Sequence, residues 1–346
     1  MTQEDITTKN ATIQPKDFAS DQDVRWCPGC GDYSILKQTQ TILAEIGIPR
    51  ENIVFVSGIG CSSRFPYYLN TYGMHTIHGR APAIATGIKL ARPELSVWII
   101  TGDGDALSIG GNHLIHILRR NVNIPILLFN NEIYGLTKGQ YSPTSKEGMV
   151  SKSTPYGSLD HPFNPVLLAM GAEATFVART MDRDPAHLRE ILKAGHLHKG
   201  SAFIEIYQNC NVFNDGAFEI FTEKDTKPLY TLFLEEKQPL VFGKNREWGI
   251  RLDGYKPQIV SLQDSGFGLD DLWIHDSRDR YKAQILATFF DDPRKENALP
   301  RPFGIIYQSQ RPCYEDLVYQ QIENVKGKNT KSLKEIIFGT ATWEVH

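Results

Sequence analysis

Short apolar runs alternate with amphipathic segments along the first two thirds of the chain. Four runs rich in β-branched and aromatic side chains predict β-strands at residues 52–57, 96–101, 124–129 and 201–207. These runs are apolar at nearly every position, which is typical of strands buried on both faces of a parallel sheet. Each run is followed by Gly, Asn or Cys residues, which indicates a loop at the end of each strand.

One segment before the first of these strands and two segments between them predict helices. Residues 32–46 place their apolar side chains at roughly helical spacing. Residues 81–91 have Pro82 in the first turn, where proline is tolerated, and residues 112–120 end in two arginines, which suit the negative end of a helix. The alternation of strands and helices predicts an α/β fold with right-handed crossovers and a mostly parallel central sheet.

Composition and secondary-structure signals differ along the sequence and divide the chain into three parts. Residues 1–23 are polar and predict a flexible leader, and residues 24–234 carry the strong strand and helix signals of a core domain. Residues 235–346 are more charged and rich in turns, and we expect this C-terminal extension to lie over the core instead of forming an independent domain.

Composition and charge narrow the class of protein. The 346 residues carry a net charge of −3, and the basic residues are scattered instead of forming the patch that nucleic-acid binding requires. No apolar run approaches the ~18 residues of a membrane span, and the polar, acidic N-terminus does not resemble a signal peptide. Five cysteines are too few for a secreted disulfide scaffold. We therefore expect a cytoplasmic protein without nucleic-acid or membrane partners.

Polar residues follow two of the predicted strands in a specific pattern. Gly102-Asp103-Gly104 ends the second strand, and Asn130-Asn131 ends the third after 25 intervening residues. If these strands are neighbours, Asp103 and Asn131 bring two oxygen ligands to one point, as Mg²⁺ prefers. The glycines let the backbone approach a diphosphate closely, and a following helix presents its N–H groups to the same anion.

Four of the five cysteines also fall in or near predicted loops. Cys27 and Cys30 are separated by a tight turn, whereas Cys61 and Cys210 follow strand ends. Four thiolates suit a [4Fe–4S] cluster or a structural zinc ion, and the first pair alone suits a redox dithiol. The single, distant positions of the last two favour the cluster, but the spacing leaves all three alternatives open. Cys313 lies outside this pattern and is predicted to be a buried structural thiol.

Five motifs within about residues 24–225 occur in a characteristic order. They are RWCPGCG at 25–31, GIGCSSR at 58–64, HGR at 78–80, GDG…NN, and YGLTKGQ at 134–140. In these motifs the chain resembles the β subunit of 2-oxoacid:ferredoxin oxidoreductases, most closely the bacterial 2-oxoglutarate type. The resemblance implies a thiamin-diphosphate-binding fold with a C-terminal extension.

The resemblance also implies the site residues. A [4Fe–4S] cluster would be held by Cys27, Cys30, Cys61 and Cys210, and Mg²⁺ by Asp103, Asn131 and the carbonyl of Ile133. Catalytic roles would fall to His78, which would hydrogen-bond near the reacting centre, and to Arg64 and Lys138, which would neutralise substrate carboxylates. The residues implied to contact thiamin diphosphate are Ile59, Gly60, Cys61, Ser62, His78, Gly102, Asp103, Gly104, Asp105, Asn131, Gly135 and Leu136.

The activity that the resemblance implies is oxidative decarboxylation of a 2-oxoacid with coenzyme A. The products would be an acyl-CoA and CO₂, and the electrons would pass through the cluster to ferredoxin. Among substrates, 2-oxoglutarate is favoured, with pyruvate or a branched-chain 2-oxoacid as alternatives. Because the chain has no second thiamin-binding domain, an α subunit would supply the glutamate for the pyrimidine ring, in an αβ or (αβ)₂ assembly.

Two rival functions remain at this stage. One is a thiamin-dependent decarboxylase or synthase subunit without a cluster, in which the cysteines are structural. The other is a zinc-stabilised binding module in which the GDG…NN pattern is incidental. Iron content distinguishes the first rival, and thiamin diphosphate binding distinguishes the second.

Overall fold

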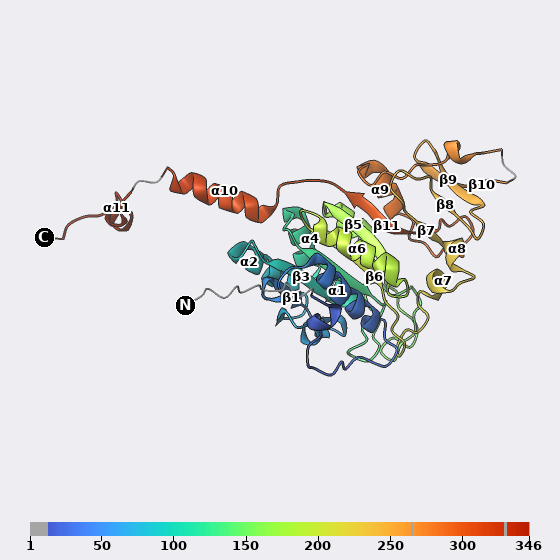
Figure 1. Ribbon diagram of the computed structural model, residues 1–346, viewed down its shortest axis with the longest axis horizontal. Coiled ribbons are helices and arrows are strands. Elements are labelled where there is room, and N and C mark those ends of the chain that lie inside the picture. Colours follow the sequence, from blue (N-terminus) through green and yellow to red (C-terminus); the bar gives the residue numbers. More distant parts are fainter. Residues whose placement is uncertain (1–12, 264–265, 329–330, 346) are drawn as a thin grey trace, which may run out of the picture.

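The computed structural model describes residues 13–263, 266–328 and 331–345. These residues form an eight-stranded sheet in the order β2-β1-β3-β4-β6-β5-β11-β7, with helices on both faces (Figure 1). The strands of this sheet are β1 Ile53–Ser57, β2 Tyr72–His75, β3 Ser96–Gly102, β4 Pro125–Asn130, β5 Phe176–Met181, β6 Ala202–Tyr207, β7 Thr231–Phe233 and β11 Arg301–Gln308. The predicted α/β class and mostly parallel sheet are confirmed.

The first six strands in this order pair in parallel, and β11 then pairs antiparallel to β5 and parallel to β7. The four strands predicted from sequence are β1, β3, β4 and β6, and they are consecutive neighbours in the sheet. Their ends differ from the predicted ends by one residue at most. The carboxyl ends of all four therefore lie at one edge of the sheet.

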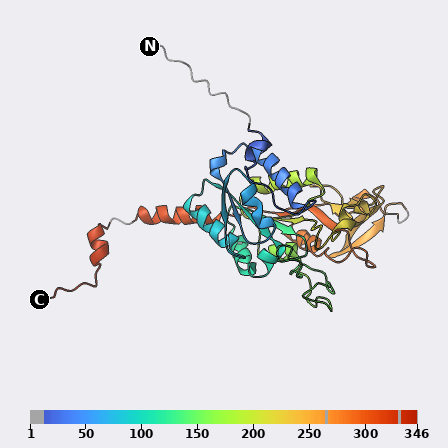
Figure 2. The same ribbon diagram turned by 90° about the horizontal axis from the view of Figure 1, so that it is seen from below.

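Helices cover both faces of the sheet. Their bounds are α1 Asp32–Ile46, α2 Ala81–Ala91, α3 Asp103–Leu107, α4 Gly111–Arg120, α5 Pro165–Gly171, α6 Pro185–Leu197, α7 Glu219–Thr222, α8 Lys227–Tyr230, α9 Arg280–Ala287, α10 Tyr314–Lys326 and α11 Leu333–Phe338. Helices α1 and α6 contact each other and share one hydrophobic core, whereas α2, α4 and α5 share the other. Figure 2 shows the same arrangement from below.

The strands explain how one sheet carries two cores. Along β1, Ile53 and Phe55 belong to the core under α1 and α6, and Val54 and Val56 belong to the opposite core. Side chains of a strand alternate between the two faces of its sheet. A strand that is apolar at every position therefore serves both cores, as its sequence predicted.

Two helices show how local sequence fixes their ends. Helix α1 ends at Gly47, whose φ of 71° is the left-handed conformation that glycine adopts without strain. Helix α6 begins at Asp184, whose carboxylate accepts a hydrogen bond from the backbone N–H of His187, and Pro185 fills the first turn.

The C-terminal extension is continuous with the core. Its strand β11 lies between β5 and β7 in the central sheet, and α9 packs against β11 and α5. Three further strands form a small antiparallel sheet: β8 Val241–Phe242, β9 Trp248–Asp253 and β10 Lys256–Ser261. Helices α10 and α11 then extend away from the body (Figures 1 and 2).

The predicted leader lies partly outside the described residues, which begin at residue 13. Its described part contains a short 3₁₀ helix, Pro15–Phe18, in which the Phe18 ring is fully buried in the core under α1. The next residue, Ala19, forms a β-bridge with Leu69. Phe18 and Ala19 thus attach the described part of the leader to the core, because burial removes the apolar Phe18 ring from water.

A buried ion pair joins two central strands. The Arg179 Nε on β5 lies 2.7 Å from the Glu205 Oε2 on β6, and both side chains are fully buried. The second carboxylate oxygen of Glu205 accepts a hydrogen bond from the side chain of Asn130 at the end of β4. The pair therefore ties the interior of the sheet to the edge at which the predicted site residues lie.

We expect Arg179→Leu to lower the free energy of unfolding by about 3–5 kcal/mol, because it leaves a buried carboxylate without its partner. The matched control is Lys193→Ala, which removes the half-exposed ion pair with Glu45 and should cost less than about 1 kcal/mol. Urea unfolding of both variants measures the difference. Equal losses would contradict a special role for the buried pair.

Candidate active site

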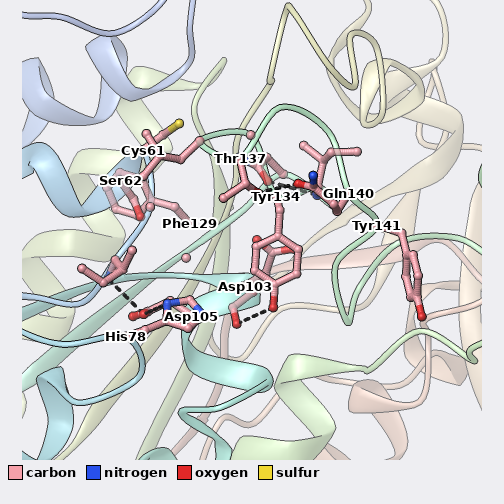
Figure 3. A pocket seen from close by; sticks show the side chains of 18 residues that line it. Cys61, Ser62, His78, Asp103, Asp105, Phe129, Tyr134, Thr137, Gln140 and Tyr141 are labelled. Carbon is pink, nitrogen blue, oxygen red and sulfur yellow. Dashed lines mark hydrogen bonds and ion pairs between the residues drawn. The ribbon is translucent and has the colours of Figure 1, made fainter. Parts of the chain in front are cut away.

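A cavity of about 500 Å³ opens at the carboxyl ends of β1, β3 and β4 (Figure 3). It is lined by Ile59, Gly60, Cys61, Ser62, His78, Gly102, Asp103, Gly104, Asp105, Phe129, Asn131, Ile133, Tyr134, Gly135, Leu136, Thr137, Gln140 and Tyr141. Every residue that was expected to contact thiamin diphosphate lies in this wall. The structure thus brings these residues together, while their contacts with a cofactor remain predictions.

Asp103 is held rigidly at the end of β3. The hydroxyl groups of Ser142 and Thr144 donate hydrogen bonds to its Oδ2 at 2.5 and 2.6 Å. Burial raises the pKa of Asp103 to about 6, and the two hydroxyl hydrogen bonds oppose this rise by stabilising the charged form. A cation in the cavity would stabilise the carboxylate further, which fits the expected role of Asp103 as a metal ligand.

Asn131 lies at the end of β4, next to the strand that carries Asp103. Its side-chain N–H donates to Gln208 Oε1 at 2.9 Å, and its Oδ1 accepts from the backbone N–H of Ile133 at 3.1 Å. Between these two residues, Glu132 adopts a φ of 56°, which turns the chain sharply. The predicted Mg²⁺ ligands Asp103, Asn131 and Ile133 therefore line one cavity, and their oxygen-rich chemistry fits that ion.

Asp105 joins two loops of the cavity. Its Oδ1 accepts hydrogen bonds from the backbone N–H groups of Gly79 and Ile59, and its Oδ2 accepts from the Thr101 hydroxyl. The same Oδ1 lies 2.9 Å from Nδ1 of His78, and Figure 3 shows the two side chains side by side. Asp105 thus lines the cavity, and its carboxylate holds the loop after β1 and lies against the His78 ring.

Two predicted catalytic residues lie outside the cavity wall. The Arg64 guanidinium donates to the backbone carbonyl of Arg25, and Lys138 is exposed in a tight turn with a φ of 76°. Their proposed contacts with substrate carboxylates stay predictions. Conversely, Phe129, Tyr141 and three residues of the YGLTKGQ motif line the cavity although they were not expected there: Tyr134, Thr137 and Gln140. Their place in that motif was the signal that could have identified these three.

The sulfurs of Cys61 and Cys210 lie close together beside the cavity. A methyl group placed on Gly135 would lie 3.5 Å from the Cys61 sulfur and 3.6 Å from the Cys210 sulfur. The loop that carries Cys27 and Cys30 is held against the end of β6, because Asn211 donates to the Pro28 carbonyl. Among the described residues, no set of three or more His, Cys, Asp or Glu side chains is spaced to hold a metal ion.

Burial keeps two of these thiols protonated when no metal is bound. Burial, followed by the negative charge of Asp32, raises the pKa of Cys30 far above its usual range and that of Cys61 to about 12. A thiolate is a metal ligand only when it is charged, so a metal would have to offset this cost. Cys313 lies apart from the other four and is buried, as expected of a structural thiol.

Comparisons with known proteins agree on one family. Residues 58–206 match the model of the thiamine pyrophosphate enzyme C-terminal TPP binding domain. The chain is 52% identical to the 2-oxoglutarate oxidoreductase subunit KorB of Mycobacterium tuberculosis, over 98% of this chain and 92% of the relative. It is 44% identical to 2-oxoacid:ferredoxin oxidoreductase 1, subunit beta, of Aeropyrum pernix, over 66% of this chain and 75% of that subunit.

A solved structure shares the fold over nearly the full length. The 2-oxoglutarate:ferredoxin oxidoreductase from Magnetococcus marinus, with 2-oxoglutarate, coenzyme A and succinyl-CoA bound, has a TM-score of 0.76 and 34% sequence identity. The similarity covers 97% of this chain and 98% of that chain. In the part of the protein that the structure describes, no helix has the length and apolar character needed to cross a membrane.

We expect Gly104→Ala to destabilise the protein by about 1–3 kcal/mol, as overpacking does. A Cβ at this position would lie 2.2 Å from the ring of Tyr134, whose hydroxyl donates to the Gly104 carbonyl. The control is Gly87→Ala in α2. A Cβ at this position would have no atom within 4 Å outside the backbone of its own helix, so the substitution should stabilise the helix by about 0.5–1 kcal/mol. Chemical unfolding measures both changes, and a neutral Gly104→Ala would contradict the close packing of Tyr134.

Proposed function

Because the chain belongs to the family of 2-oxoacid:ferredoxin oxidoreductase β subunits, we propose its complete reaction as follows. Together with an α subunit, it converts 2-oxoglutarate and coenzyme A to succinyl-CoA and CO₂ and passes the electrons to ferredoxin. The near full-length similarity to KorB and to the Magnetococcus marinus enzyme supports 2-oxoglutarate over pyruvate or a branched-chain 2-oxoacid.

One observation carries the proposal: Cys61 lines the cavity and also lies beside a second predicted cluster ligand. It lines the cavity that contains Asp103 and Asn131, and its sulfur lies beside that of Cys210 across Gly135. A cofactor in the cavity and a cluster on the cysteines would therefore be direct neighbours. Such proximity is what transfer of electrons from a decarboxylated substrate to an iron–sulfur cluster requires.

We assign the cavity residues the following roles. Asp103, Asn131 and the Ile133 carbonyl hold Mg²⁺, and the glycines at 102 and 104 let the backbone approach the diphosphate. When bound, thiamin diphosphate supplies the electron sink for decarboxylation. His78 hydrogen-bonds near the reacting centre, and its imidazole ring lies against the Asp105 carboxylate.

The roles of Arg64 and Lys138 depend on the rest of the assembly. Neither residue lines the cavity, so we propose that the substrate carboxylate they neutralise extends beyond the cavity wall toward the partner. That partner is an α subunit in an αβ or (αβ)₂ assembly, and it supplies the glutamate for the pyrimidine ring. The similarity of the chain to β subunits supports this division.

The four cysteines Cys27, Cys30, Cys61 and Cys210 are proposed to hold one [4Fe–4S] cluster. None of the five cysteines forms a disulfide in the structure. We place the protein in the cytoplasm, where thiols are kept reduced. Zinc on the same thiolates would leave the chain without a redox centre. A cluster-free thiamin enzyme or a zinc-stabilised binding module would then replace the proposed function.

Anaerobically prepared protein, co-expressed with its α subunit, should contain about four iron and four acid-labile sulfide per chain. Cys210→Ser should lose most of this iron because it removes one of the four thiolates. Cys313→Ser is the matched control and should keep the cluster, since Cys313 lies apart from the other four. Zinc without sulfide in the unmodified protein would refute the cluster.

Rates of ferredoxin reduction by the same complex with different 2-oxoacids identify the substrate. With coenzyme A present, we expect kcat/KM for 2-oxoglutarate to exceed that for pyruvate by at least about a hundredfold. Pyruvate lacks the distal carboxylate and would leave the proposed cationic side chains without a partner. Comparable values for the two substrates would make the enzyme a broad 2-oxoacid oxidoreductase.

A further inference from the structure

The side chain of Gln208 connects the two predicted cofactor sites. It is 1% exposed and lies directly after β6, two residues before Cys210. Its Oε1 accepts a hydrogen bond from the side chain of Asn131 at 2.9 Å. Its Nε2 donates to the sulfur of Cys30 at 3.3 Å. One buried amide thus touches a predicted Mg²⁺ ligand at one end and a predicted cluster ligand at the other.

The orientation of this amide is fixed by its neighbours. Nε2 carries two hydrogens, and besides the Cys30 sulfur it donates to the Asn209 carbonyl at 2.6 Å. If the amide were flipped, its carbonyl would face the Asn209 carbonyl and its NH₂ group would face that of Asn131. Both contacts would be repulsive, so the arrangement has only one favourable state.

The backbone places Gln208 equally firmly. Its N–H donates to the Asn130 carbonyl at 2.9 Å and so continues the pairing of β6 with β4. The side chain therefore starts from a fixed point at the sheet edge. The ends of β4 and β6, and the loop that carries Cys30, are linked through this single residue.

We propose that Gln208 is a positioning residue that couples the two cofactor sites. By holding the N–H group of Asn131, it turns the Asn131 oxygen toward the metal. By donating to Cys30, it stabilises the negative charge on that sulfur, and hydrogen bonds to cluster sulfurs are among the factors that set reduction potentials. This inference rests on the proposed function, because it assigns a role toward Mg²⁺ and the cluster.

Two variants separate the two contacts. Gln208→Glu keeps an oxygen that accepts from Asn131 but removes the donor to Cys30. Gln208→Met removes both contacts at similar volume. The matched control is Gln38→Met, which changes another buried glutamine, located on α1. All are prepared anaerobically as the complex with the α subunit, and iron content verifies that each has folded and loaded its cluster.

The first measurement is the midpoint potential of the cluster, from a redox titration followed by electron paramagnetic resonance. Gln208→Met and Gln208→Glu should both shift the one-electron reduction equilibrium about tenfold toward the oxidised form, which corresponds to about 59 mV. Gln38→Met should leave it unchanged. An unchanged potential in both Gln208 variants would overturn the contact with Cys30 as a functional one.

The second measurement is the affinity for thiamin diphosphate at fixed Mg²⁺ concentration, by calorimetry without substrate. Gln208→Met should bind about tenfold more weakly, as loss of a group that orients a metal ligand typically does. Gln208→Glu should bind thiamin diphosphate about as tightly as the unmodified protein does. Equal affinities of Gln208→Met and the unmodified protein would overturn the positioning of Asn131. If the unmodified complex contained no cluster and bound no thiamin diphosphate, the proposed function itself would fall.

Discussion

Parallel pairing of β1, β3, β4 and β6 is the constraint on which the whole site depends. Because these strands run in one direction, the loops that follow them share one edge of the sheet. Asp103, Asn131, Cys61 and Cys210 are far apart in sequence, yet each follows one of these strands. The parallel pairing of neighbouring strands thus brings the predicted diphosphate-binding motif and the predicted cluster cysteines to the same edge of the sheet.

A line of buried polar groups runs beneath this edge. Arg179 pairs with Glu205, and Glu205 accepts from Asn130. The Asn130 oxygen lies 2.9 Å from the Thr144 hydroxyl, whose one hydrogen is donated to Asp103. Each polar atom in the line is desolvated, so each depends on its partner for stability. The exact position of Asp103 is therefore determined by contacts that reach into the middle of the sheet.

The sequence predicted those elements whose local pattern of apolar and polar residues is sufficient to indicate their structure. The strands β1, β3, β4 and β6 are apolar at most positions, and α1 has a clear period and a terminal glycine. Strand β5 was not predicted, because the adjacent Arg179 and Thr180 interrupt its apolar run. The burial of Arg179 depends on Glu205 from another strand. Likewise, nothing in the sequence around Ser142 and Thr144 indicated that their hydroxyls would meet Asp103, since that contact spans about forty residues.

The C-terminal extension supplies β11, the strand that covers the edge of β5 in the central sheet. A protein cut at residue 235 would retain the cavity residues and the four predicted cysteine ligands but would lose the strand that pairs with β5. The open edge of β5 would expose unpaired backbone N–H and carbonyl groups, and such edges recruit strands from other molecules. The C-terminal extension thus protects the catalytic sheet against self-association, and a shortened chain would be expected to aggregate even though its site residues were intact.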